Sequence, residues 1–355
     1  MLTPLILRRS RTIAVCTLLA VCFIHNAQAQ TPVGEVSRCE QSLTQQPVPV
    51  TIETCREELA APVSTLKRVN VLENLGKAYL SQNEPDLAMS TWREAAQYIA
   101  LDRKNPSGSE QWARLQVLVA QTLVQVDKSK DAEAMFMNTA ERIDREIGRF
   151  TMPAGIVQDA LGSFYALQNQ AAKAEEAFRK ARIIHEIRLG KMHPKTIETR
   201  MNYAVGLLDM GQEPEAKAEF QVLADVIANH PDFQNQPIKA EVLTFLGTLQ
   251  MREDDLVSAA KNYQTAFEVR QAAFGPDDVR TSQSLNNLGV VLYRAGDLQR
   301  AEKALSRAYI IRKDALGDTD ALTLSTQKNL QAVIAAQNAA KGPTIIQQST
   351  PPKKP

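Results

Sequence analysis

The sequence is poor in aromatic residues, glycine and cysteine. Only 5% of its 355 residues are aromatic, 15 are glycine and four are cysteine. Long stretches rich in Ala, Leu, Glu, Gln, Lys and Arg take their place, and these residue types favour helix over strand. We therefore expect an all-α fold with almost no β-sheet.

The chain also lacks an excess of charge of either sign. Its 41 basic residues face 40 acidic ones, and removal of residues 1–29 would leave 38 against 40. Such a balance gives no electrostatic footprint for nucleic acid or for an anionic membrane surface. We expect neither as a partner of the mature chain.

Long hydrophobic runs are missing except near the N-terminus. There, three arginines precede an apolar run of thirteen residues, and Ala27 and Ala29 supply small residues for cleavage. The pattern predicts a signal peptide over residues 1–29, cleaved after Ala29, and a periplasmic or secreted mature chain that does not insert into the membrane. An uncleaved anchor is a weaker alternative, because a helix needs roughly 20 residues to span a bilayer. A lipoprotein site at Cys22 ranks third, since the preceding Val21 is bulky.

Removal of this segment leaves two cysteines, Cys39 and Cys55. In an exported and therefore oxidising context each thiol has an obvious partner in the other, and we predict a disulfide. A loop of this size would gain about 3 kcal/mol of stability from the bond. The alternative is two free, partly buried thiols.

An internal repeat of about 42 residues organises most of the chain. Small residues serve as its anchors: Gly76, Ala120, Gly162, Ala204, Gly247, Gly289 and Ala332. Alanine stands twelve residues after each of the first six: Ala88, Ala132, Ala174, Ala216, Ala259 and Ala301. A bulky apolar residue stands sixteen after: Trp92, Phe136, Phe178, Phe220, Tyr263 and Leu305. The pattern predicts antiparallel helix pairs whose backbones approach closely at the small residues, with the bulky side chain beside the contact. Neither helix buries its apolar face alone, so neighbouring pairs must stack.

This alternation resembles the tetratricopeptide repeat, and the longer period resembles its kinesin-light-chain-type subgroup. Residues 285–317 carry the subgroup's features almost whole, with a double asparagine, a Gly-Asp turn, an Ala-Glu helix start and a closing Leu-Gly. The resemblance covers roughly residues 66–337. It implies a right-handed superhelical solenoid of antiparallel helix pairs that binds another protein.

The domain organisation follows from these patterns. After the signal peptide we expect a disulfide-clipped helical segment over residues 30–63 and a repeat array over residues 64–338, with six repeats and a capping helix. The proline-rich, polar residues 339–355 are predicted to be a disordered tail.

The resemblance also suggests a binding site, because the first helices of such repeats line a groove. The residues expected there are Asn74, Lys77, Gln121, Asn202, Thr248, Arg252, Asn286, Asn287, Tyr293 and Arg294. The family's asparagines bind the main chain of an extended peptide through an amide that donates and accepts. They could equally satisfy neighbouring helix ends or face water. The two arginines favour a ligand with some acidic character, whereas Lys77 has no second lysine to complete a carboxylate clamp.

Catalytic motifs are not apparent. Three Ser-x-x-Lys matches have no companion motif, and His185-Glu186 lacks the second histidine of a zinc-protease helix. We interpret His185 as a surface histidine and expect no metal, no cofactor and no enzymatic activity. The sequence predicts a protein-binding scaffold, or else a cell-envelope component that associates through its convex face.

Overall fold

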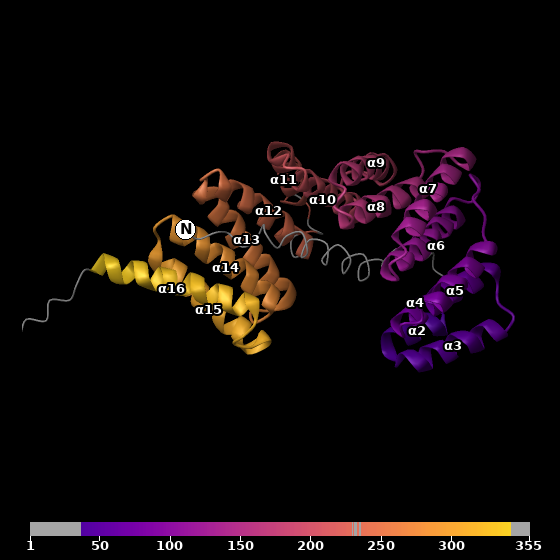
Figure 1. Ribbon diagram of the computed structural model, residues 1–355, viewed down its shortest axis with the longest axis horizontal. Helices are drawn as coiled ribbons and strands as arrows, with labels where there is room; N and C mark the ends of the chain where they lie inside the picture. Colours follow the sequence, from indigo (N-terminus) through magenta and orange to yellow (C-terminus); the bar gives the residue numbers. More distant parts are fainter. Residues whose placement is uncertain (1–36, 229, 231–232, 234–235, 342–355) are drawn as a thin grey trace, which may run out of the picture. The chain divides into compact units, whose positions relative to one another are not determined.

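The computed structural model describes residues 37–228, 230, 233 and 236–341, and these fold into fifteen helices without a strand (Figure 1). The predicted all-α solenoid is confirmed. None of the described helices is long and apolar enough to cross a membrane. The predicted signal peptide and nearly all of the predicted tail lie outside the described residues.

The chain divides into two units, whose described parts are residues 37–212 and 213–341. The first unit holds α2 (Arg38–Gln45), α3 (Val48–Ala60), α4 (Thr65–Ser81), α5 (Pro85–Gln97), α6 (Pro106–Gln125), α7 (Ser129–Glu146), α8 (Met152–Leu167), α9 (Ala171–Leu189) and α10 (Pro194–Asp209). The second holds α11 (Glu213–Ala228), α12 (Pro237–Arg252), α13 (Leu256–Phe274), α14 (Val279–Arg294), α15 (Leu298–Leu316) and α16 (Ala321–Lys341). Within each unit successive helices contact one another, as stacked pairs require.

The predicted close approach within each pair is present. A Cβ atom built on Gly76 would lie 2.2 Å from the Trp92 ring, and one on Gly162 would lie 2.4 Å from Phe178. The alanines twelve residues after the anchors are at most 1% exposed. Because only a hydrogen atom fits beneath these rings, the glycines are required by packing.

The turn inside each pair has a repeated backbone conformation. The residue seven after every one of the six anchors has a positive φ: Asn83, Asp127, Asn169, Gly211, Asp254 and Gly296. Asparagine, aspartate and glycine are the residues that enter this left-handed region most readily. The chain therefore turns between the two helices of a pair in the same way in all six repeats.

The predicted disulfide between Cys39 and Cys55 is present and fully buried. It joins α2 to α3, and both helices contact α4, the first helix of the array. The carboxylate of Glu58 accepts a hydrogen bond from the Cys39 backbone N–H at 3.0 Å and pairs with Lys67 Nζ at 2.9 Å. These contacts fasten the disulfide-linked helices to the first repeat.

The last helix, α16, differs from the first helices before it. Its anchor Ala332 is half-buried, and the exposed Gln331 takes the place that an apolar residue holds in all six earlier repeats. A polar residue at this position suits the end of a stack of repeats. The helix continues to Lys341, three residues beyond the array end predicted from the sequence.

Candidate functional site

The predicted groove residues are distributed over both units. Those of the first unit lie on α4, α6 and α10: Asn74, Lys77, Gln121 and Asn202. Those of the second lie on α12 and α14: Thr248, Arg252, Asn286, Asn287, Tyr293 and Arg294. We call the surface formed by the first helix of each pair the first-helix face, and that formed by the second helix the second-helix face.

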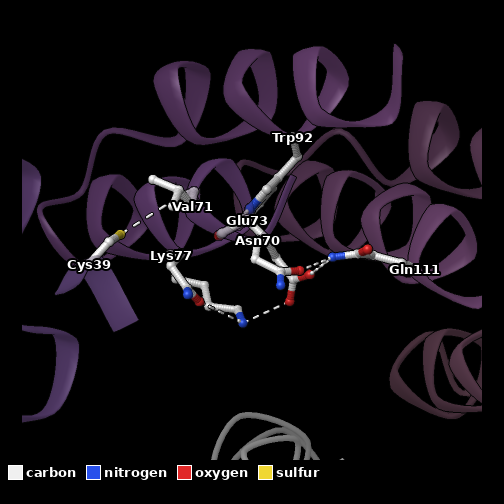
Figure 2. Close-up of polar contacts among 8 residues, drawn as sticks. Cys39, Asn70, Val71, Glu73, Lys77, Trp92 and Gln111 are labelled. Carbon is white, nitrogen blue, oxygen red and sulfur yellow. Dashed lines mark hydrogen bonds and ion pairs between the residues drawn. The ribbon is translucent and has the colours of Figure 1, made fainter. Parts of the chain in front are cut away.

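On α4 the predicted residues belong to a network of polar contacts (Figure 2). Asn74 is buried, and its Oδ1 lies 3.4 Å from Lys77 Nζ, which pairs with Glu73 Oε1 at 2.8 Å. From α6, Gln111 Nε2 donates to Asn70 Oδ1 at 2.6 Å and also reaches Glu73 at 3.5 Å. Lys77 is thus already paired, which weakens the case for a carboxylate clamp further.

The carboxyl group of Glu73 is held in its charged form. Burial raises its pKa, but the charge and hydrogen bond of Lys77, the charge of Arg114 and the hydrogen bond from Gln111 outweigh that effect and leave the pKa below its ordinary value. The first-helix face at the first two repeats therefore carries an ionised, paired acid. Gln121, on the same helix as Gln111, is half-buried.

A second acid, which is buried, lies between α8 and α10. Asp159 is 6% exposed, and its Oδ2 accepts from Lys195 Nζ at 2.6 Å. Burial raises its pKa, but Lys195 and His185 more than offset this and hold the pKa below its usual value. Asn202, 3% exposed, lies near enough to lower that pKa as well, although its Nδ2 and the Oδ1 of Asp159 fall short of a well-formed hydrogen bond.

Neither acid was singled out from the sequence. Glu73 and Asp159 both stand three residues before an anchor, and their partners Gln111 and Lys195 both stand nine before the next anchor. An acid at the same repeat position in two repeats was the available signal. It indicates a polar seam between consecutive first helices of the first unit.

In the second unit uncharged amides make the side-chain contact between the first helices α14 and α16. Asn329 Nδ2, on α16, donates to Asn286 Oδ1 at 3.1 Å, and Asn286 Nδ2 lies 3.5 Å from Asn287 Oδ1. Asn286 and Asn329 are half-buried, whereas Asn287 is 3% exposed and its Nδ2 has no hydrogen-bond partner. We call these three residues the amide ladder. Tyr293, also half-buried, lies two helical turns beyond Asn286 on the same face of α14.

The two predicted groove arginines are bound to the preceding repeat. Arg252 pairs with Glu213, and Arg294 donates to the Met251 carbonyl oxygen at 2.8 Å and to Asp254 Oδ1 at 2.9 Å. Their charges are therefore partly neutralised by the turns beside them.

Thr248 also serves its own repeat. It is buried, and its hydroxyl lies 2.9 Å from the hydroxyl of Tyr263 on the second helix of the pair. It supports the packing of α12 on α13.

The interpretation of His185 as a surface residue was wrong, because its side chain is 0% exposed. Its position is 23 residues after an anchor, where three other repeats have buried or half-buried isoleucines and two have the buried arginines Arg270 and Arg312. The polar side chain in each case bonds a hydroxyl fourteen residues later: His185 with Thr199, Arg270 with Ser284, and Arg312 with Thr326. A polar residue at a position that other repeats fill with isoleucine was the signal that could have identified it.

The second-helix face of the first unit contains a hollow of about 470 Å³ between α5 and α7. Met89, Leu123 and Met135 contribute apolar surface to it, and its charged lining residues are Asp86, Arg93, Lys128 and Asp131. At the next junction, between α7 and α9, Lys173 and Glu133 form an ion pair across the helices at 3.2 Å.

No group of three or more histidine, cysteine or acidic side chains within the described residues could hold a metal ion. The arrangement offers hydrogen bonds, apolar contacts and paired charges, which are the components of a binding surface.

Comparisons with known proteins agree with this architecture. Residues 157–195 and 239–314 match family models described as tetratricopeptide repeat. No curated protein matches the sequence.

Solved structures share the fold at low identity. The structure of BtubC (BKLC) from P. vanneervenii is 18% identical, with a TM-score of 0.57 over 72% of this chain and 94% of that one. A signal transduction ATPase with a tetratricopeptide repeat sensor, from Pyrococcus horikoshii, is 13% identical, with a TM-score of 0.60 over 94% of this chain and 47% of that one. PilF of Pseudomonas aeruginosa is 18% identical, with a TM-score of 0.50 over 74% of this chain and 98% of that one.

The matches cover helices whose anchors, turns and buried rings repeat as the sequence predicted. The chain therefore contains tetratricopeptide repeats, which the family models match over residues 157–195 and 239–314.

Proposed function

We propose that this chain is a non-enzymatic scaffold that holds an extended peptide segment of a partner protein on the first-helix face of its second unit. Tetratricopeptide repeats generally mediate protein–protein interaction. The proposal adds a face, a set of residues and a ligand chemistry to that general role.

The amide ladder is the observation that carries the proposal. It presents half-buried amides at Asn286 and Asn329. Each amide both donates and accepts, as a peptide main chain requires. Val290 and Tyr293, one and two turns further along α14, are half-buried and offer apolar contact to side chains of the same segment.

The pairing of Arg252 and Arg294 changes the expected chemistry of the partner. Both guanidinium groups already interact with acidic residues of the preceding repeat. Because the ladder itself is uncharged, we favour a partner segment that is uncharged and has one or two apolar side chains, over the acidic segment expected from the sequence.

Export is a further part of the proposal. The arginines, the apolar run and the small residues before Gln30 support a cleaved signal peptide and a periplasmic or secreted scaffold. N-terminal sequencing of the protein purified from its native host should find Gln30 as the first residue. Retention of Met1 would contradict cleavage.

A second candidate function is docking or assembly through the second-helix face. The hollow between α5 and α7 favours it, because a lining that combines apolar and charged residues suits a contact surface. In that case the binding site would lie on the second helices of the pairs in the first unit.

Site-specific crosslinking separates the two candidates. An aromatic photoreactive residue is placed at Tyr293 in one variant and at Lys128, beside the hollow, in another, and each is irradiated in the envelope fraction. The proposal predicts a discrete adduct from position 293 and none from position 128. Adducts from position 128 alone would transfer the function to the second-helix face.

A further inference from the structure

Two of the chain's four histidines occupy the connection between α9 and α10. His185 lies in the last turns of α9, and His193 is the N-cap residue of α10. Two contacts tie this connection together: Thr196 Oγ1 donates to the His185 carbonyl oxygen at 3.3 Å, and the Lys195 backbone N–H donates to His193 Nδ1 at 3.1 Å.

The surroundings of His185 suit a neutral ring. Its side chain is 0% exposed, Nδ1 lies 3.0 Å from Thr199 Oγ1, and Nε2 is buried without a hydrogen-bond partner. On α8, Gly155 makes room for the ring, since a Cβ there would lie 2.7 Å from Nε2. A protonated ring would place both a charge and an unpaired N–H in this site.

The role of His193 also requires the neutral form. Its Nδ1 accepts a hydrogen bond from the first turn of α10, which only an unprotonated nitrogen can do. Protonation would turn this acceptor into a donor and would place a positive charge at the positive end of the helix dipole. The equivalent cap of α14 is Asp278, whose carboxylate accepts from the Arg280 N–H at 2.8 Å.

We propose that the α9–α10 connection is an acid-sensitive joint of the repeat array, which opens when His185 and His193 take up protons. Neutral histidines hold it closed, because both contribute to the closed form as uncharged groups.

Charged groups on the helices around His185 also affect its protonation. Asp159 on α8 favours its protonation, whereas Lys195 on α10 and His193 oppose it. On α9 the neighbouring Glu186 is engaged by Arg182 and by Arg200 of α10, both at 3.3 Å. Burial is the largest influence and lowers the pKa of His185 to about 4, and burial also lowers the pKa of His193.

The directions of these two pKa shifts determine the pH range in which the joint opens. Both groups have a lower pKa in the closed joint than in the open one, so the closed form is fully favoured above the ordinary histidine pKa of about 6.5 and is progressively lost as the pH falls toward about 4. Asp159 acts in a separate window, because its pKa is lowered: its stabilising contribution is fully present above the ordinary aspartate pKa of about 3.9 and is lost only as the pH falls below that value.

Hydrogen exchange of the whole chain, followed by mass spectrometry between pH 7 and pH 5, tests the proposal. After correction for intrinsic exchange rates, the protection factors of backbone amides in α9 and α10 should fall by up to about tenfold per pH unit for each histidine that drives opening. Amides of α14 and α15 in the same molecule serve as the internal control and should change little.

Two variants assign the effect to the histidines. His185→Ile introduces the residue found at this repeat position in three other repeats, and His193→Asn keeps an acceptor at the helix cap that does not titrate. The double variant should fold at pH 7 and show flat protection factors down to pH 5. An equal fall in wild type and double variant, or no fall in wild type, would overturn the proposal.

Discussion

The two units present the same helix pairs but different chemistry between consecutive first helices. In the first unit the seam is charged, with Asp159 buried against Lys195. In the second unit the amide ladder occupies the seam, and the buried charge has moved to the second helices, at Arg270 and Arg312. One repeat pattern thus tolerates ion pairs, amides or buried cations between neighbouring helices.

The comparison predicts that the charged seam is the more sensitive to loss of one partner. Lys195→Met would leave the buried carboxylate of Asp159 without its main counter-charge, and the free energy of unfolding of the first unit should fall by about 3 kcal/mol. Denaturant unfolding, with hydrogen exchange to assign the loss to the first unit, measures the effect.

The double variant Asp159→Leu/Lys195→Met is the matched control. Removing both charges should recover most of the lost stability, because no charge is left unpaired. A double variant as unstable as Lys195→Met would show that Lys195 acts through packing or through its other contacts.

Overpacking at the contact between the two helices of a pair should lower the free energy of unfolding by the same amount in both units. Ala174 and Ala301 are each at most 1% exposed at the same repeat position. Substitution of either by leucine should therefore destabilise its unit by about 2 kcal/mol through overpacking. Thermal melts of the two variants, beside the exposed control Ala273→Leu, check this. A loss of stability confined to one unit would contradict the prediction that the same close helix contact is present in both units.

The amide ladder should contribute less to folding than the ion pair does. Asn286→Ala removes two side-chain contacts between neutral groups and should lower the free energy of unfolding of the second unit by about 1 kcal/mol. Urea unfolding of this variant and of Lys195→Met, measured in the same buffer, gives the ratio of the two losses in free energy of unfolding. A larger loss for Asn286→Ala would reverse the comparison.

The smallest effect is expected at a buried arginine. Arg270 donates to the hydroxyls of Thr244 and Ser284, and burial, opposed only by Glu241, lowers its pKa. Arg270→Ile introduces the residue type of three other repeats at this position, so the free energy of unfolding should change by less than about 1 kcal/mol. Calorimetry of the variant would contradict this if the second unit lost its cooperative transition.

Much of the fold could be predicted from the sequence because its determinants are local and repeated. Gly76 and Gly162 mark close contacts that recur every 42 to 44 residues, and the disulfide between Cys39 and Cys55 follows from cysteine count and context. The seam could not be predicted in the same way. Whether Asp159 meets Lys195, 36 residues away, depends on the relative placement of two first helices, which periodicity alone does not give.

The candidate site was predicted only in part. The shared repeat position of Arg252 and Arg294 predicted that both face a ligand, yet each arginine is paired with an acidic residue of the preceding repeat. Burial of His185 was missed because an isolated polar residue at an apolar position resembles a surface residue until its neighbours are known.

The most direct test of the account is the affinity of the second unit for its partner. A partner captured by crosslinking at Tyr293 is purified and titrated by calorimetry against wild type, against Asn286→Ala/Asn329→Ala, and against Asp131→Lys at the hollow. If the partner binds at the amide ladder, the ladder variant should bind it at least about tenfold more weakly, because hydrogen bonds in a buried interface are lost. Asp131→Lys should bind it like wild type. Unchanged binding by the ladder variant, with weakened binding by Asp131→Lys, would contradict the account.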